Sequence, residues 1–165
     1  IVDAQTGANT LHFSALPAGN YYVSVRHRNH LGVITASPIA LSTTATLVDF
    51  TQTTTAVYGE QTRYIANKQA LLWAGDINGS NTLTANGPSN DATALLGNVM
   101  TSDDNTAANT NYIVYGYQAS DLNMDGKTLF TGPNNDVSVL MGNIILHPAN
   151  SSFAANYIVK GGLSP

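Results

Sequence analysis

Residues 121–127 read DLNMDGK, and this stretch decides how the rest of the sequence is interpreted. Oxygen-bearing side chains occupy its first, third and fifth positions, which are Asp121, Asn123 and Asp125. A glycine follows where the backbone must turn sharply, and the carbonyl group of Lys127 can supply one more oxygen. D-x-N-x-D-G is the first half of an EF-hand calcium loop, because Ca²⁺ is held by six to eight oxygen atoms. The stretch therefore predicts a calcium site.

A related stretch, DINGSNT, lies 45 residues earlier at 76–82. Asp76 and Asn78 keep the first and third positions, and the carbonyl group of Thr82 takes the seventh. Ser80 replaces the acid at the fifth position. Because serine is neutral, we expect the first site to bind calcium more weakly than the second.

The similarity continues beyond the loops at the same offset. Residues 87–91 (GPSND) match residues 132–136 (GPNND), and the tetrapeptide NYIV ends both copies. Two copies in constant register indicate duplication, with repeats at about 73–117 and 118–162.

Each copy also contains an acid that can close its loop, four positions later than in a standard EF-hand. The twelfth position of the second loop is Gly132, and the next acid is Asp136 at the sixteenth. Asp91 stands at the same position of the first loop, so we assign Asp91 and Asp136 as the closing ligands. Such loops are often Asx turns without metal, but five of the ten acids in the chain fall on the proposed ligand positions.

A short apolar segment follows each loop and is predicted to be helical, at about 90–100 and 135–146. Asn90 and Asn135 each precede an acid, which suits an N-cap at the positive end of a helix dipole. Pro148 would stop the second helix.

The first 50 residues have the alternating pattern of short β-strands. The candidate strands are 10–16, 21–28, 31–35 and 44–50. A complete sandwich has about seven strands. The segment therefore packs on the rest of the chain, or strands upstream of residue 1 or from a neighbouring subunit complete it.

The predicted fold class is α+β, with two parts. Residues 1–56 are expected to form a small domain of β-sandwich or transthyretin-like character, and residues 57–165 the duplicated calcium-binding domain. Residues 51–55 read as a linker, and residues 61–73 as a helical or extended bridge.

The composition excludes several classes of protein. Only 10% of residues are charged, the net charge is −4, and the bases are scattered, so no nucleic-acid partner is expected. No apolar stretch approaches the roughly 20 residues of a membrane span. The absence of cysteine rules out disulfides and thiolate metal sites. Because the chain begins at Ile1 without an apolar leader, we expect a processed form or a fragment.

Other candidate sites are weaker. There is no G-x-S-x-G motif, and no opposed pair of acids outside the loops, so the chain is predicted not to be an enzyme. His27 and His30 would point to opposite faces of a strand, so we interpret residues 27–30 as the polar end of a turn. The aromatic side chains could stack on a carbohydrate, but core or interdomain packing is the plainer prediction. They are Tyr21, Tyr22, Tyr58, Tyr64, Trp73, Tyr115 and Tyr117.

The loops 73–80 (WAGDINGS) and 120–127 (SDLNMDGK), each followed by a short helix, resemble the dockerin repeats of cellulosomal proteins. The four inserted residues and Ser80 depart from that family. Residues 16–33 (LPAGNYYVSVRHRNHLGV), with GPNND at 132–136, are similar to the C-terminal region of large secreted surface proteins of environmental bacteria. This resemblance implies secretion and calcium binding.

We therefore expect a non-catalytic structural module of a secreted cell-surface or extracellular filament protein, stapled by two Ca²⁺ ions. The second hypothesis is a dockerin-like docking module that attaches a secreted enzyme or adhesin to a partner. The first hypothesis predicts self-association, with a strand from a neighbouring subunit completing the sheet, and the second predicts a distinct protein partner.

Overall fold

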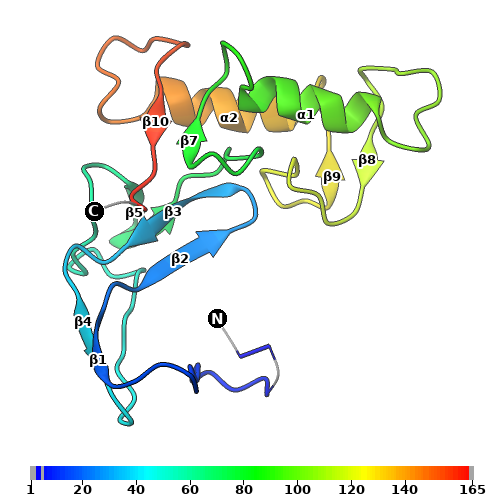
Figure 1. Cartoon of the computed structure of the whole chain (residues 1–165). Helices are drawn as coiled ribbons and strands as arrows, with labels where there is room; N and C mark the ends of the chain where they lie inside the picture. Colours follow the sequence, from blue (N-terminus) through cyan, green and yellow to red (C-terminus); the bar gives the residue numbers. More distant parts are fainter. Residues whose placement is uncertain (1–2, 5, 164–165) are drawn as a thin grey trace.

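The structure is a computed structural model that describes residues 3–4 and 6–163. In that part of the chain, two helices and short antiparallel strands form a small α+β unit. The helices are α1 (Asp91–Met100) and α2 (Asp136–Ile145). The strands are β1 (Gly19–Tyr21), β2 (Ser24–His27), β3 (His30–Ile34), β4 (Ile39–Leu41), β5 (Arg63–Ala66), β6 (Gln69–Leu72), β7 (Thr82–Leu83), β8 (Val114–Tyr115), β9 (Lys127–Thr128) and β10 (Val159–Lys160). Figure 1 shows both helices along one side of the molecule, with the β2–β3 hairpin beneath them.

Both helices begin where the sequence predicts. The side chain of Asn90 accepts a hydrogen bond from the backbone N–H of Thr93 at 2.8 Å, and Asn135 accepts one from Ser138 at the same distance. These caps satisfy N–H groups that have no partner within the helix. The predicted helices are confirmed, to within one residue at either end.

Each copy ends in a strand that pairs with a strand of the other copy. β10, at the end of the second copy, pairs with β7 in the first loop, and Val159 lies opposite Leu83. β8, at the end of the first copy, pairs with β9 in the second loop, and Val114 lies opposite Thr128. Adding 45 to Val114 and Leu83 gives Val159 and Thr128, so the two pairs are equivalent. The duplication therefore corresponds to a reciprocal, pseudo-symmetric packing of the copies.

One hydrophobic cluster lies between the helices, the loops and the β2–β3 hairpin. Its buried members are Leu31, Trp73, Leu83, Leu95, Val99, Val114, Leu122, Leu140, Ile144 and Val159. Leu31 comes from β3 and is fully buried, and its N–H donates to the carbonyl group of Trp73 at 2.8 Å. The boundary predicted near residue 56 therefore does not coincide with a gap in the packing, and independent folding of the two parts stays a prediction.

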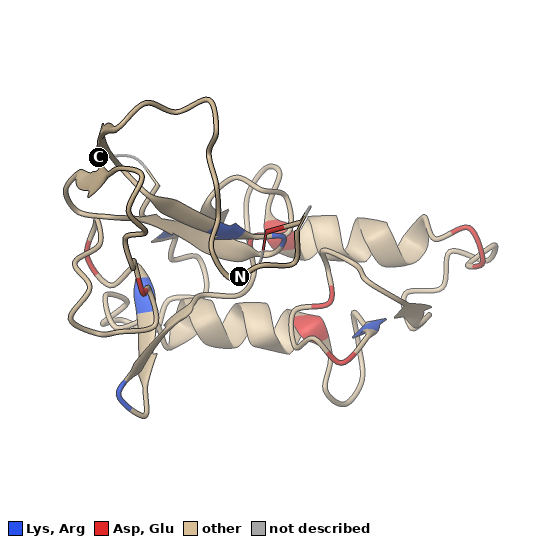
Figure 2. Cartoon of the chain, turned by 90° about the horizontal axis from the view of Figure 1, so that it is seen from below, with Lys and Arg blue, Asp and Glu red and all other residues tan. Residues whose placement is uncertain are grey.

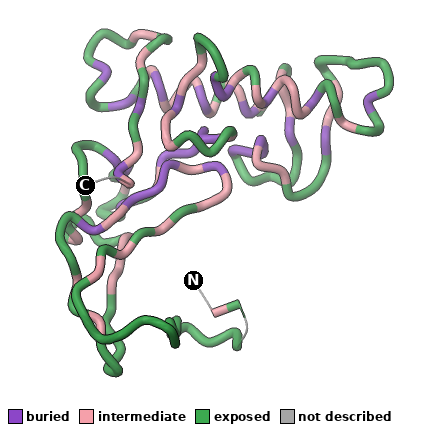
Figure 3. The backbone as a smooth tube through the Cα atoms, in the orientation of Figure 1, coloured by how far each residue is buried: buried purple, intermediate pink, exposed green. Residues whose placement is uncertain are grey.

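The sandwich-like sheet is not confirmed. Each strand in the described residues pairs with a single partner, so all the sheets there have two strands. Residues 10–16 and 44–50 form no strand, and the predictions for them are wrong. Their alternating apolar side chains have no second surface to cover, and Phe13 and Leu47 are 63% and 90% exposed. Figure 3 shows this part of the chain as an exposed arm, away from the buried segments near the helices.

Residues 61–73 are extended, and most of them form the β5–β6 hairpin. Its turn is made by Asn67 and Lys68, both with positive φ, as a two-residue hairpin loop requires. Residues 51–55, predicted to be a linker, form turns, and Thr51 accepts the N–H of Ala70.

Candidate metal centre

The second loop is curled by its own side chains. Asp121 accepts the backbone N–H groups of Asp125 and Gly126, both at 3.1 Å, through its two carboxylate oxygens. Asn123 Oδ1 accepts the N–H of Asp125 at 2.9 Å, and Asp125 Oδ1 accepts the N–H of Lys127 at 2.9 Å. The backbone thus bends around the oxygen-bearing side chains at the first, third and fifth positions, as the sequence predicts.

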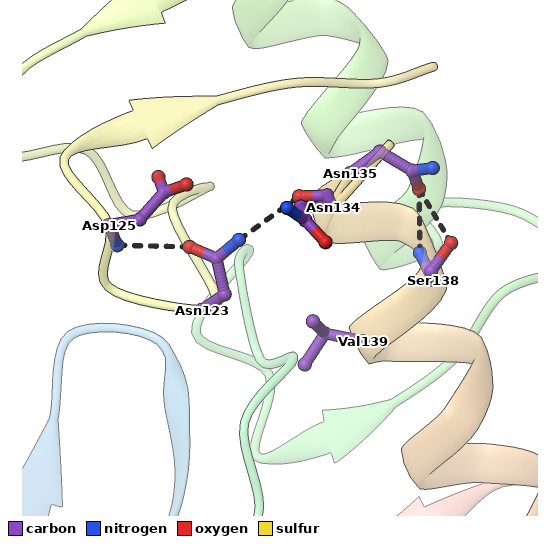
Figure 4. A pocket seen from close by; sticks show the side chains of 6 residues that line it. All are labelled: Asn123, Asp125, Asn134, Asn135, Ser138 and Val139. Carbon is purple, nitrogen blue, oxygen red and sulfur yellow. Dashed lines mark hydrogen bonds between the residues drawn. The ribbon is translucent and has the colours of Figure 1, made fainter. Parts of the chain in front are cut away.

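The close view shows how the loop meets helix α2. Asn123 contacts Asp125 on one side, and on the other its amide group donates to the carbonyl group of Asn134 at 3.1 Å (Figure 4). A hollow opens there, lined also by Asn135, Ser138 and Val139. Its walls are rich in amide, hydroxyl and carboxylate oxygens, the atom type that binds Ca²⁺.

The carboxylates alone do not make a metal cluster. Within residues 3–4 and 6–163, no three side chains of His, Cys, Asp or Glu form a group that could hold an ion. A metal at either loop would therefore also depend on Asn oxygens, backbone carbonyl groups and water. Carboxylate, amide and carbonyl oxygens each have two lone pairs, so an N–H bond leaves one free for a cation.

The first loop repeats most of these hydrogen bonds, but the bond to Asp121 Oδ1 has no counterpart at Asp76 Oδ1. Asp76 Oδ2 accepts the N–H of Asn81 at 3.0 Å, and Asn78 Oδ1 accepts the N–H of Ser80 at 2.9 Å. Asn81 has a positive φ of 60°, where the second loop has glycine, so the left-handed turn survives the substitution. Ser80 Oγ lies 2.8 Å from the hydroxyl of Thr82.

Among the described residues, Asp76 contains the one buried side-chain oxygen or nitrogen atom without a hydrogen-bond partner. Its Oδ1 atom is buried and has no hydrogen-bond partner in the described part of the chain. Burial raises the pKa of the Asp76 carboxyl, against the opposing effect of N–H groups of the loop, first that of Asn81. A buried, unpaired carboxylate oxygen is costly, and a bound cation would satisfy it. The first loop therefore fits a calcium ion.

Asp91 and Asp136 have a clear structural role. Asp136 Oδ1 accepts the N–H groups of Leu122 (2.7 Å) and Asn123 (3.3 Å), and its Oδ2 accepts that of Leu129 at 2.9 Å. Asp91 makes the equivalent bonds in the first loop, to Ile77, Asn78 and Thr84. Both carboxylates are almost completely buried, and burial raises the pKa of each.

Each of these two acids thus accepts backbone N–H groups from both ends of its own loop and holds the two ends together. They also lie at the first residue of each helix, where a negative charge is favoured. Figure 2 shows acidic positions at the beginnings of both helices. Their assignment as closing calcium ligands stays a prediction.

The β2–β3 turn contacts the second loop, which the sequence does not predict. Arg28 Nη2 lies 3.7 Å from Asp121 Oδ2, and Arg28 Nε donates to the carbonyl group of Gln118 at 2.8 Å. The guanidinium carbon lies 3.6 Å from the centre of the Tyr117 ring. Arg28 is about 90 residues away from these partners in the sequence, so no local pattern could have indicated the contact.

Residues 28 and 29 form the turn, so its prediction is confirmed, but the expected orientation of its histidines is wrong. His27 and His30 lie opposite each other in the ladder, beside an irregularity in its register. Their rings meet edge to face, with Nδ1 atoms 2.8 Å apart.

We expect the stability of the chain to depend on pH through His30. Burial lowers the pKa of His30 from 6.5 to about 4, with further contributions from His27 and Arg28. The unfolded chain therefore binds a proton between these values that the folded chain does not, so we expect the free energy of unfolding to fall as the pH drops from 6.5 to about 4. Urea denaturation across this range should show a flatter profile for His30→Gln, and an unchanged one for His12→Gln, which alters an exposed residue. An unchanged profile for His30→Gln would contradict the assignment.

The aromatic residues divide into two groups. Trp73 is buried, donates to the carbonyl group of Gln61 at 2.9 Å and contacts the rings of Tyr64 and His147. The prediction of core packing is confirmed for Trp73. It is wrong for Tyr22, Tyr58 and Tyr115, which are more than 40% exposed. Tyr64 and Tyr117 are also more than 40% exposed, but the Tyr64 ring contacts that of Trp73, and the Tyr117 ring contacts Arg28 from the other predicted part.

No protein family, no curated protein and no solved structure matches the chain. Neither α1 nor α2 is long and apolar enough to cross a membrane, and the described residues contain no other helix.

Proposed function

We propose that the two loops bind one Ca²⁺ ion each and that the chain is a non-catalytic structural module of a secreted cell-surface or filament protein. The observation that carries the proposal is the buried, unpartnered Oδ1 atom of Asp76, at the first position of a loop curled like the second. Without a cation, this buried oxygen accepts no hydrogen bond, and only the nearby N–H groups of the loop offset the desolvation of the carboxylate.

In this proposal, the first, third, fifth and seventh positions of each loop hold the ion. For the first loop these are the side chains of Asp76, Asn78 and Ser80 and the carbonyl group of Thr82. For the second loop they are the side chains of Asp121, Asn123 and Asp125 and the carbonyl group of Lys127. Calcium, when bound, supplies a divalent charge that cross-links oxygens along each loop. Asp91 and Asp136 hold the loops in shape from behind.

The role of such ions is structural. The chain has no cysteine, so no disulfide stabilises it. Only 10% of its residues are charged, so networks of ion pairs contribute little to its stability. Binding energy at a loop that exists only in the folded chain adds to the free energy of unfolding. We also propose that the two repeats are dockerin-like, as expected from the sequence.

A docking module is the second candidate, and exposed apolar side chains beside the second loop favour it. Tyr115, Tyr117 and Met124 are 67%, 78% and 52% exposed. A docking module should capture a distinct partner from the native secretome, whereas an assembly module should associate with itself.

Thermal melting with and without a chelator tests the calcium proposal. At a hundredfold excess of free calcium over Kd, each site adds about 2.7 kcal/mol. For a chain of this size each kcal/mol corresponds to roughly 2–4 °C, so two sites predict a fall in Tm of roughly 10–20 °C on chelation. In the control variant Asn123→Ala/Asp125→Ala, which alters exposed side chains of the second loop, about half of that difference should be lost. Equal melting temperatures with calcium and with chelator would contradict the proposal.

A further inference from the structure

One buried residue outside the duplication touches the first position of both loops. Asn29, in the β2–β3 turn, is completely buried. Its backbone carbonyl oxygen accepts the N–H groups of Gly75 at 2.8 Å and of Asp76 at 3.1 Å. Its side-chain amide donates to the backbone carbonyl group of Asp121 at 2.7 Å. Asn29 is thus a physical link between Asp76 and Asp121.

The orientation of this link is fixed from several sides. The Nδ1 atoms of His27 and His30 lie 3.0 and 2.8 Å from Asn29 Oδ1, which leaves the amide N–H group to face Asp121. Arg28, the preceding residue, contacts the Asp121 carboxylate. A buried amide that is bonded through both its oxygen and its nitrogen behaves as a rigid connector, because turning it would break several hydrogen bonds at once.

We propose that Asn29 is a positioning residue that couples the two loops, so that an ion in one loop strengthens binding in the other. The inference rests on the proposed calcium function. Ordering the second loop fixes the carbonyl group of Asp121, and through Asn29 it also fixes the N–H groups at the start of the first loop. The entropy cost of ordering the first loop is then partly met before its ion arrives, which is positive cooperativity.

A second contact at the first loop provides a matched control. Asn143 on α2 donates from its side-chain amide to the carbonyl group of Ala74 at 2.8 Å. It has the same residue type, the same kind of bond and nearly the same length as the link from Asn29 to Asp121. The side-chain hydrogen bond of Asn143, however, reaches the segment that leads into the first loop and not the second loop.

The test is calorimetric titration of the full chain with calcium chloride. The affinity of the first loop is measured with the second loop intact and with it silenced by Asn123→Ala/Asp125→Ala. The ratio of the two affinities is the coupling factor. Measuring it with and without Asn29→Ala requires four proteins, which together form a double-mutant cycle. We expect a factor of about 10 in the unaltered chain and about 1 with Asn29→Ala. With Asn143→Ala the factor should remain near its original value, even where the affinity itself falls.

The outcomes separate the two claims. No calcium binding by the unaltered chain overturns both the proposed function and the coupling. Two ions bound with a coupling factor of 1 in the unaltered chain overturn the coupling alone, and this result needs no variant of Asn29 to fold. A factor that persists in Asn29→Ala also overturns the coupling role of Asn29. If the alanine variant does not fold, Asn29→Asp keeps the backbone carbonyl group and the side-chain size and removes the amide donor to Asp121, and loss of the factor is expected again.

Discussion

Replacing Asp136 with alanine is expected to lower the free energy of unfolding of the calcium-free chain by about 3 to 5 kcal/mol. The substitution leaves three N–H groups in and around the second loop without their acceptor, those of Leu122, Asn123 and Leu129. Each buried group without a partner costs about 1–3 kcal/mol. Asp91→Ala should behave in the same way, because Asp91 makes the equivalent bonds in the first loop.

Urea denaturation in the presence of a chelator measures this effect without any contribution from metal. Asp104→Ala is the matched control, since it removes an exposed acid from a polar connector and should change the stability by less than about 0.5 kcal/mol. A loss seen only when calcium is present would contradict this role in holding the loop ends together. It would instead favour Asp91 and Asp136 as closing ligands.

Replacing Asp76 with asparagine should have effects of opposite sign with and without calcium. In a chelator, the variant removes a buried charge whose Oδ1 atom has no partner, so we expect it to be more stable than the unaltered chain by about 1 kcal/mol. With calcium, the loss of a charged ligand should weaken binding at the first loop by about 10- to 100-fold, so the variant should then be the less stable protein. Thermal melts under the two conditions would show the reversal.

The contribution of Asp76 to stability is also expected to depend on pH. Burial raises the pKa of its carboxyl in the folded chain, so folding favours the protonated form. The calcium-free chain should therefore gain stability from this group as the pH falls from neutral through the raised pKa, and Asp76→Asn should remove that gain. Asp49→Asn is a contrast of opposite sign, because hydrogen bonds, first from the hydroxyl of Thr51, shift the pKa of Asp49 downward. If Asp76→Asn is less stable than the unaltered chain both in chelator and with calcium, Asp76 is a structural residue and not a calcium ligand.

The features that could be predicted from the sequence are those set by short-range patterns. Residues 121–127 specify their own curl, because each acceptor side chain is a few residues from the N–H group it binds. Asn90 and Asn135 specify where the helices begin for the same reason. The duplication could be read from a constant offset, and the reciprocal pairing of the copies follows the same offset.

The features that could not be predicted depend on contacts between distant segments. The link from Asn29 to Asp121 spans 92 positions, and nothing in the sequence around Asn29 indicates a buried amide. Spacing placed Asp136 near the second loop but could not show that its oxygens face backbone N–H groups. The strands expected at 10–16 and 44–50 failed because alternation predicts a strand only where a partner strand and a surface to cover are present.

Calorimetric titration of the metal-free chain with calcium chloride tests most directly whether the curled loops are metal sites. Two ions per chain should bind, the tighter one at the second loop, where Asp125 adds a charge that Ser80 lacks. The variant Asn123→Ala/Asp125→Ala should then retain one ion, at the first loop. A chain that takes up no calcium, with its loops folded as described, would contradict the account.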